Sequence, residues 1–346
     1  MTLTVLSVPF PFAAVNDDPV GGAEQVAAQL DRALVRGGHR SIVVAAEGSH
    51  TAGDLVSVPR AAAPFDAEAQ KRVHHAVRGS IATVLEREPV DLIHFHGIDF
   101  AAYLPVAGPP ALVTLHLPID WYSRRALRAQ RPRTWFNPVS ASQARAAPPD
   151  VELLPFVENG VAADRFPSDV RKQAFALVLG RVCPEKGFHN AISASVRAGV
   201  PLLIAGELFA WREHQRYFES EIRPRLDRLR RWLGSVAGNG KRRLLAAARC
   251  VLIPSLAPET SSLVAMEALA AGTPVIAYRT GALPDIVDHG RTGYIVDDVP
   301  GMAEAIRAVG RIDPQACRAA ARERFALDRT IAAYFALYQR LAAGDS

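Results

Sequence analysis

Cysteine is scarce in this chain of 346 residues, and the spacing of its cysteines argues against two common kinds of site. Cys183, Cys250 and Cys317 are far apart and form no CxxC pair. An odd, widely spaced set predicts neither a disulfide framework nor a zinc site, and it favours a reducing compartment.

Long apolar runs are also missing. No stretch reaches the ~18 apolar residues that a membrane-spanning helix needs. The opening segment MTLTVLSVPFPF has no basic region before its short apolar run, so we expect a first β-strand there and no signal peptide. These features predict a cytoplasmic protein.

Neither sign of charge dominates. The chain has 40 basic and 35 acidic residues, a net charge of +5 and a pI near 9.3. This balance argues against a nucleic-acid partner and is compatible with an anionic small molecule or an acidic membrane surface. The length predicts two domains, and a hydrophobic content of 49% is typical of globular proteins.

Three nucleotide-binding motifs are absent. The segment GSVAGNGKRR fails as a phosphate loop, because Ser235 stands where a glycine is needed and Arg242 where Ser or Thr is needed. No GxGxxG follows the first expected strand, and no Asp-x-Asp triplet occurs. We therefore expect no metal and no cofactor, and a ligand held by cationic side chains and helix dipoles.

Short apolar runs alternate with helical patterns, which predicts an α/β fold with parallel sheets. Helices are expected over residues 23–36, 71–87 and 263–270, the last stopped by Gly272 and Pro274. The expected strands of the first half are LTVLSV, SIVVAA, DLIHFH, ALVTLH, TWFNPVS and ELLPFV. Those of the second half are FALVLG, PLLIAG, RWLGS, CVLIPS, PVIAYR and GYIVD.

The two series predict two doubly wound, Rossmann-like domains that face each other across a cleft. The first covers residues 1–157 and is completed by a returning helix within 327–346. The second covers 158–326. The joint lies in the segment VENGVAADRFPSDVRKQ, and the apolar last helix is expected to pack back across it.

Ligands of parallel sheets bind beyond the carboxyl ends of the strands, so residues that follow strands are the candidates. After FALVLG come Arg181 and Lys186, two cations that can converge on a diphosphate. Gly180 and Gly187 allow close approach of the backbone there. The alternative is a pair of solvated surface cations.

A second group follows CVLIPS. Glu259 precedes Ser261 and Ser262, which stand where a helix begins and where free N–H groups favour phosphate. Ser262 serves equally as a simple N-cap. Glu267 lies in the apolar helix and needs a partner, because a buried carboxylate is costly alone. A ribose diol would satisfy it, and the alternative is a salt bridge to an arginine.

The first half offers weaker signals. Gly21 and Gly22 start a helix after the first strand, where a backbone can approach a phosphate or sugar, although a flexible loop explains them equally. His116 ends the strand ALVTLH and is either a hydrogen-bond donor to substrate or a structural histidine. His94 and His96 share one face of a strand, but no third metal ligand is evident.

Taken together, these motifs resemble the family 4 (GT4) retaining glycosyltransferases of the GT-B fold. The resemblance spans nearly the whole chain and rests on GGAEQ, VSASQ, VENGV, LGRVCPEKG, PETSSLVAMEALAAGTPVIA and GALPDIVDHGRTGYIVD, in the family's order. The Glu-x7-Glu pair formed by Glu259 and Glu267 is the most specific element.

The resemblance implies a nucleoside diphosphate sugar, most simply UDP-linked, bound mainly by the C-terminal domain without a metal. Arg181 and Lys186 would hold the diphosphate, Glu267 the ribose and Glu259 the sugar hydroxyls. The remaining implied contacts are the backbone near Gly180 and at Ser262, Leu263 and Val264, with Gly21, Gly22 and His116 contributed by the other domain.

The family's mechanism is implied to be attack on the same face as the departing diphosphate, with Glu259 not acting as a nucleophile. Many members have Phe-Gly where this chain has Ser261-Ser262, so the donor sugar is left open. Alternatives are another GT-B enzyme, such as an epimerase or phosphorylase, and a non-catalytic sugar-nucleotide-binding module.

The acceptor is open, whether a glycan, a lipid-linked molecule or a small molecule. The segment DWYSRRALRAQRPR combines Trp121 and Tyr122 with five arginines. It suits an anionic bilayer surface with a lipid-linked acceptor, an anionic sugar, or a solvated basic loop. The first option would make the protein peripheral to the inner face of the membrane.

Overall fold

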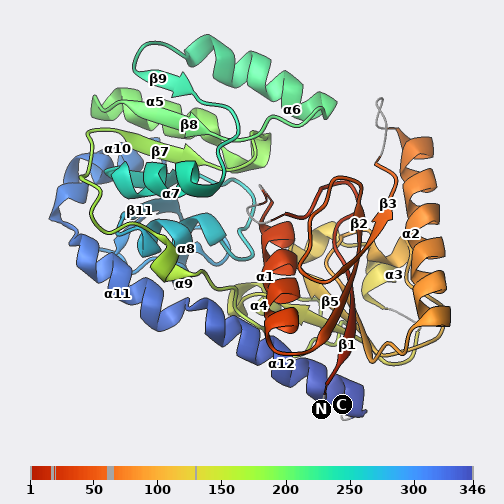
Figure 1. The fold of residues 1–346 in the computed structure, drawn as a ribbon. Helices are drawn as coiled ribbons and strands as arrows, with labels where there is room; N and C mark the ends of the chain where they lie inside the picture. Colours follow the sequence, from red (N-terminus) through yellow and green to blue (C-terminus); the bar gives the residue numbers. More distant parts are fainter. Residues whose placement is uncertain (1, 17–18, 20, 61–65, 129–130, 345–346) are drawn as a thin grey trace. The chain divides into compact units, whose positions relative to one another are not determined.

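A computed structural model describes residues 2–16, 19, 21–60, 66–128 and 131–344. The chain forms two compact units, Met1–Val157 with Ile331–Ser346, and Glu158–Thr330. Each unit contains one six-stranded sheet whose paired strands all run parallel. The predicted α/β fold with two doubly wound sheets is confirmed (Figure 1).

The first unit has the strand order β3-β2-β1-β4-β5-β6. Its strands are β1 (Thr4–Val8), β2 (Arg40–Ala46), β3 (Asp54–Val58), β4 (Leu92–Phe95), β5 (Ala111–Leu115) and β6 (Thr134–Pro138). Its helices are α1 (Gly22–Arg36), α2 (Ala67–Arg87), α3 (Arg124–Leu127) and α4 (Ala141–Arg145), and most of α12 (Leu327–Ala343) also belongs to it.

Alternation along β2 explains why helices cover both faces of this sheet. Ile42 and Val44 join the core that includes the α2 residues Val73 and Val77. The intervening Val43 and Ala45 cluster instead with Ala28 of α1 and with Val15. Because successive side chains of a strand point to opposite faces, one buried strand serves both layers.

The second unit repeats this plan with the order β12-β11-β10-β7-β8-β9. Its strands are β7 (Ala176–Leu179), β8 (Leu202–Ala205), β9 (Arg230–Trp232), β10 (Cys250–Ile253), β11 (Val275–Tyr278) and β12 (Gly293–Val296). Its helices are α5 (Phe188–Ala198), α6 (Arg212–Tyr217), α7 (Gly238–Ala247), α8 (Leu263–Ala270), α9 (Leu283–Ile286), α10 (Val299–Ala308) and α11 (Pro314–Arg324).

Both sheets therefore reverse their strand order once. The reversal lies between β1 and β4 in the first unit and between β7 and β10 in the second. Ligands of open α/β sheets bind beyond the carboxyl ends of the two strands that flank such a reversal. The loops that follow these four strands are the places to look for a site.

The predicted strand in ELLPFV is wrong, and β3 was not predicted. Residues 152–157 have no strand assignment, although the Leu154 and Val157 amides donate to the Phe136 and Pro138 carbonyls of β6. The strand β3 has the sequence DLVSV, and four of its five residues are not buried, so the apolar signal of a core strand is weak. Within the described residues, no helix is long and apolar enough to span a membrane.

Candidate functional site

The loop after β7 carries both predicted phosphate-binding cations. Arg181 lies two residues beyond the end of the strand, after Gly180, and Lys186 ends a short 3-10 helix over Pro184–Lys186. Gly187 then starts α5 in the left-handed conformation, with φ of 62°. A Cβ atom at Gly187 would lie 2.2 Å from the Pro254 carbonyl oxygen, so glycine lets this loop pack against the loop after β10.

Replacing Gly187 with alanine should lower the free energy of unfolding. An alanine in the left-handed conformation costs ~1–2 kcal/mol by itself, and the loss should be larger here because the Pro254 carbonyl must also move. Gly199 is the matched control, since its φ is 70° but a Cβ there would meet no atom within 4 Å. Urea denaturation of both variants measures the difference. Equal losses would contradict the close contact.

Lys186 and Glu259 form an ion pair across these two loops. The Lys186 Nζ lies 2.6 Å from the Glu259 Oε1, and the Ser255 hydroxyl donates to the same oxygen. Burial acts to raise the pKa of Glu259, but Lys186, the Ser255 hydrogen bond and the charge of Arg181 together hold this pKa below its usual value. The structure thus brings Arg181, Lys186 and Glu259 together around an ionised carboxylate.

Glu267 has a protein partner. Its side chain is only 4% exposed, and its Oε1 lies 2.8 Å from the Nζ of Lys241, which belongs to α7. The salt-bridge alternative is therefore present, with a lysine in place of the expected arginine. Lys241 lies in the segment GSVAGNGKRR, which matches no complete motif, so its sequence does not predict this pairing.

The helix start at α8 contains the two serines. The Ser262 hydroxyl accepts a hydrogen bond from the Ala265 amide, so Ser262 is the N-cap. The Ser261 Oγ is buried and has no hydrogen-bond partner among the described residues. Leu263 and Val264 lie in the first turn, where the helix itself supplies no acceptors for the amide groups. This end of α8 retains hydrogen-bonding capacity for a ligand.

In the first unit, Gly21 is the N-cap of α1 and Gly22 its first residue. A Cβ at Gly21 would lie 1.7 Å from a carboxylate oxygen of Glu24. Glu24 is buried. The absence of a side chain at Gly21 therefore has a local explanation, which is room for the Glu24 carboxylate at the helix start.

His116 follows β5 and, itself half-buried, ends a row of buried polar side chains. Its Nε2 lies 3.0 Å from the Nδ1 of His96, and the rings of His94 and His96 lie 3.9 Å apart between centroids at an angle of 41°. The His94 Nδ1 lies 2.7 Å from the Tyr338 hydroxyl, and its Nε2 is 2.7 Å from the Thr114 hydroxyl. Burial lowers the pKa of His116 to about 3, so this imidazole is neutral near pH 7.

Acid should destabilise this unit through the histidine row. Burial lowers the pKa of His94 and His96 well below the usual value, so the folded state stays neutral where the unfolded chain binds protons. The free energy of unfolding should therefore decrease as pH falls below about 6.5, by ~1.4 kcal/mol per pH unit for each histidine. Denaturation of wild type and His96→Asn between pH 7.5 and 5.5 should show a shallower slope in the variant. Parallel slopes would contradict this assignment.

The arginine-rich segment DWYSRRALRAQRPR has part of its positive charge neutralised by ion pairs. Arg124 and Arg128 both form ion pairs with Asp150. Arg131 donates to backbone carbonyls, including that of Pro109. Residues 129 and 130 lie outside the described part of the chain. Part of the positive charge is therefore compensated within the protein, and Trp121 is 41% exposed.

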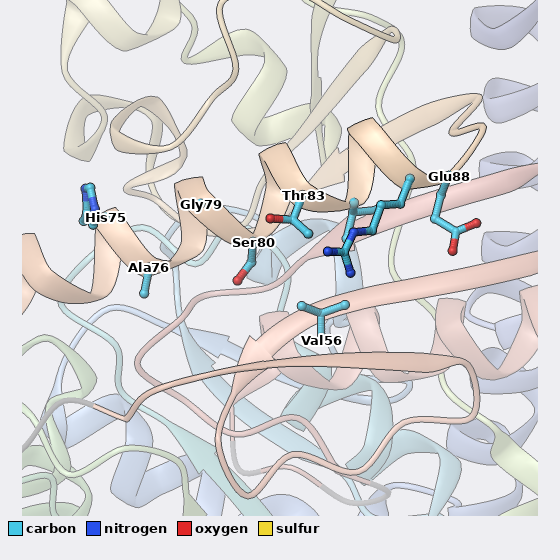
Figure 2. Close-up of a pocket in the computed structure, with 9 residues that line it drawn as sticks. Val56, His75, Ala76, Gly79, Ser80, Thr83 and Glu88 are labelled. Atoms are coloured by element: carbon cyan, nitrogen blue, oxygen red, sulfur yellow. The ribbon is translucent and has the colours of Figure 1, made fainter.

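A cavity of about 560 Å³ lies away from all these residues, between α2 and β3. Figure 2 shows His75, Ser80 and Thr83 of α2 beside it, with Val56 of β3 across from them. Its walls include none of the predicted site residues, and it does not lie at a strand reversal. We therefore do not place the nucleotide site there.

Comparisons with known proteins match this chain to glycosyltransferases. A family model described as "Glycosyltransferase Family 4" matches residues 20–147, and one described as "Glycosyl transferases group 1" matches residues 174–310. The glycogen synthase of Mycobacterium tuberculosis is 34% identical over 185 residues, which are 50% of this chain and 44% of that protein. A D-inositol 3-phosphate glycosyltransferase of Kribbella flavida is 32% identical over 175 residues, 46% of this chain and 41% of that protein.

Solved structures cover the chain more completely. AviGT4, a glycosyltransferase involved in avilamycin A biosynthesis, aligns with a TM-score of 0.73 and 25% identity over 99% of this chain and 98% of its own. Sucrose-phosphate synthase of Thermosynechococcus elongatus aligns with a TM-score of 0.79 and 19% identity over 99% and 100%. The two parallel sheets define a GT-B fold.

The chain belongs to the family 4 glycosyltransferases. The alignments with the two curated relatives extend over less than half of each relative's length. The family and fold expected from the sequence are confirmed.

Proposed function

We propose that the protein is a retaining glycosyltransferase that moves a sugar from a nucleoside diphosphate sugar, UDP-linked, to an acceptor, and that it needs no metal for this step. The observation that carries the proposal is the Lys186–Glu259 pair beside Arg181, at the strand reversal between β7 and β10. An Anabaena protein, HepE, whose fold is similar at a TM-score of 0.75 and 19% identity, was solved with UDP and glucose.

The pair is suited to bind both parts of a donor. A lysine ammonium has three N–H donors, and Glu259 occupies one of them, so two remain for phosphate oxygens. The two hydrogen bonds described for the Glu259 carboxylate both end on Oε1. We assign Oε2 to a hydroxyl of the donor sugar. Lys186 and Glu259 would then hold adjacent parts of one donor molecule.

The chemical step moves negative charge onto the leaving diphosphate. Arg181, Lys186 and the amide end of α8 would stabilise that charge, which is an electrostatic form of catalysis that needs no rearrangement of solvent. A leaving phosphate oxygen accepts the proton of the acceptor hydroxyl. Glu259 remains an ionised hydrogen-bond acceptor and does not form a covalent bond to the sugar.

The remaining residues would complete the donor site. We assign Glu267 to the ribose, where the ion pair with Lys241 orients its carboxylate. The unpartnered Ser261 Oγ is assigned to the donor sugar, together with the amides of Leu263 and Val264.

A phosphorylase that uses pyridoxal phosphate would need a lysine free to form a Schiff base. Lys71, Lys186 and Lys241 are each paired with a carboxylate, and Lys172 donates to the Thr273 hydroxyl. Phosphate-dependent turnover without a nucleotide would favour the phosphorylase instead.

A thermal-shift screen with UDP, GDP, ADP and dTDP tests donor binding. UDP at about 100 times its dissociation constant should stabilise the protein by about 2.7 kcal/mol. The shift that UDP causes should be the same in the presence and in the absence of EDTA. Each shift is measured against protein without nucleotide in the same buffer. A shift that appears only with added metal, or with none of the nucleotides, would overturn the proposal.

A further inference from the structure

A group of metal-ligating side chains lies in the second unit, outside the residues assigned to the donor. Ligand atoms of Cys183, Glu185 and His214 all lie within 4.8 Å of one another. Cys183 and Glu185 belong to the loop after β7, and His214 belongs to α6. From this convergence we propose that the three side chains form a binding site for Zn²⁺ that joins the loop to α6.

The imidazole provides an independent indication of a missing ligand. His214 is 7% exposed, and its Nδ1 is buried without a hydrogen-bond partner among the described residues. Burying an unpaired polar nitrogen is unfavourable, so such an atom calls for an explanation such as a bound ion. A coordinated metal would remove this deficit.

The surroundings of the histidine limit its freedom. The His214 ring stacks on Trp211 at 5.7 Å with an interplanar angle of 14°, and Phe209 contacts it edge-on at 6.4 Å. Aromatic packing of this kind holds an imidazole in one orientation and restricts water, as the shell around a metal site does.

The loop that carries the other two ligands is also fixed by its backbone. The Val182 amide donates to the Glu207 carbonyl at 3.0 Å, and the Leu256 amide donates to the Glu185 carbonyl at 2.8 Å. Tetrahedral zinc places its ligand atoms roughly 3.5 Å apart. The three ligand atoms already lie within 4.8 Å of one another, so small side-chain movements would bring them into range.

The ligand set favours zinc over magnesium or calcium. Thiolate, imidazole and carboxylate together are a zinc set, with a water in the fourth position, whereas magnesium and calcium prefer oxygen ligands. On binding, the Cys183 thiol gives its proton to solvent and zinc forms bonds to the sulfur, the His214 nitrogen and a Glu185 carboxylate oxygen. Five of the six waters of the hydrated ion leave, and one stays in the fourth position. The thiolate and the Glu185 carboxylate balance the two charges of the ion.

Cobalt substitution tests the site in the full chain. Metal-free protein, kept reduced with a phosphine, is titrated with Co²⁺, which should produce a thiolate-to-cobalt charge-transfer band that saturates at one equivalent and disappears on addition of Zn²⁺. Cys183→Ser should lose the band, and His214→Gln should weaken Co²⁺ binding by at least ~10-fold. Cys317→Ala, which removes a different buried cysteine, should keep both.

Absence of the band in the wild-type protein would overturn the proposal. So would a band that persists in Cys183→Ser, because the metal would then be bound elsewhere. Should Cys183→Ser fail to fold, His214→Gln decides the question, since unchanged affinity in that variant excludes the site. No nucleotide is present in these titrations, so their failure leaves the proposed transferase activity untouched.

Discussion

Replacing Lys186 with alanine is expected to lower the turnover of sugar transfer by about 10²- to 10³-fold, the effect of removing one preorganised donor to a developing negative charge. The variant removes the ammonium group that lies 2.6 Å from Glu259 and that we assign to the diphosphate. The measurement is the release of nucleoside diphosphate from the donor. The pKa of Glu259 should rise in the variant, because its nearest cation is gone.

The control for this variant is Lys71→Ala. Lys71 is an exposed lysine that pairs with Glu68 on α2, far in the sequence from the proposed site. It should leave turnover unchanged, and both variants should keep the circular dichroism spectrum of the wild type. Wild-type turnover in Lys186→Ala would remove this residue from the mechanism.

Glu267→Gln should lower the free energy of unfolding by about 3–5 kcal/mol, the usual result of leaving one member of a buried ion pair alone. In this variant Lys241, whose side chain is 13% exposed, loses the carboxylate that pairs with it. Lys241→Met removes the lysine that pairs with Glu267 and should also be destabilising. Denaturant unfolding measures both effects, and a loss below about 1 kcal/mol would show that the pair is solvated.

The double variant Lys241→Met/Glu267→Gln separates structure from binding. It removes both charges of this ion pair, so most of the stability lost in either single variant should return. A carboxylate that also holds the ribose would still be missing, so the KM for the donor should stay raised by at least ~10-fold, the equivalent of one hydrogen bond to a charged group. Recovery of stability and KM together would make Glu267 purely structural.

Local rules were enough to locate most of the elements. The helix predicted over residues 263–270 has those bounds, because the N-cap Ser262 and the left-handed Gly272 mark its ends. Strand β3 was missed because it lies at the sheet edge, where exposure removes the apolar pattern. The segment ELLPFV was misassigned because an extended, half-exposed segment has the composition of a strand without a complete ladder.

The candidate site was predictable only where its residues follow strands. Arg181, Lys186 and Glu259 were identified that way, because parallel strands end at one edge of the sheet. Lys241 and His214 could not be, since each lies on a helix with no motif, and only the packing of α7 and α6 brings them to their partners. Pairings between distant elements depend on tertiary structure, which sequence spacing does not encode.

The helix α12 has a consequence for synthesis on the ribosome. Tyr334, Tyr338 and Leu341 are buried, and Tyr338 bonds to His94 of β4 in the first unit. Residues 158–330 form the second unit from one continuous stretch, whereas the first must wait for these late residues. Domains generally fold as units once their chain has emerged. The second unit can therefore be complete while the first, although synthesised earlier, still exposes the surface that α12 will cover.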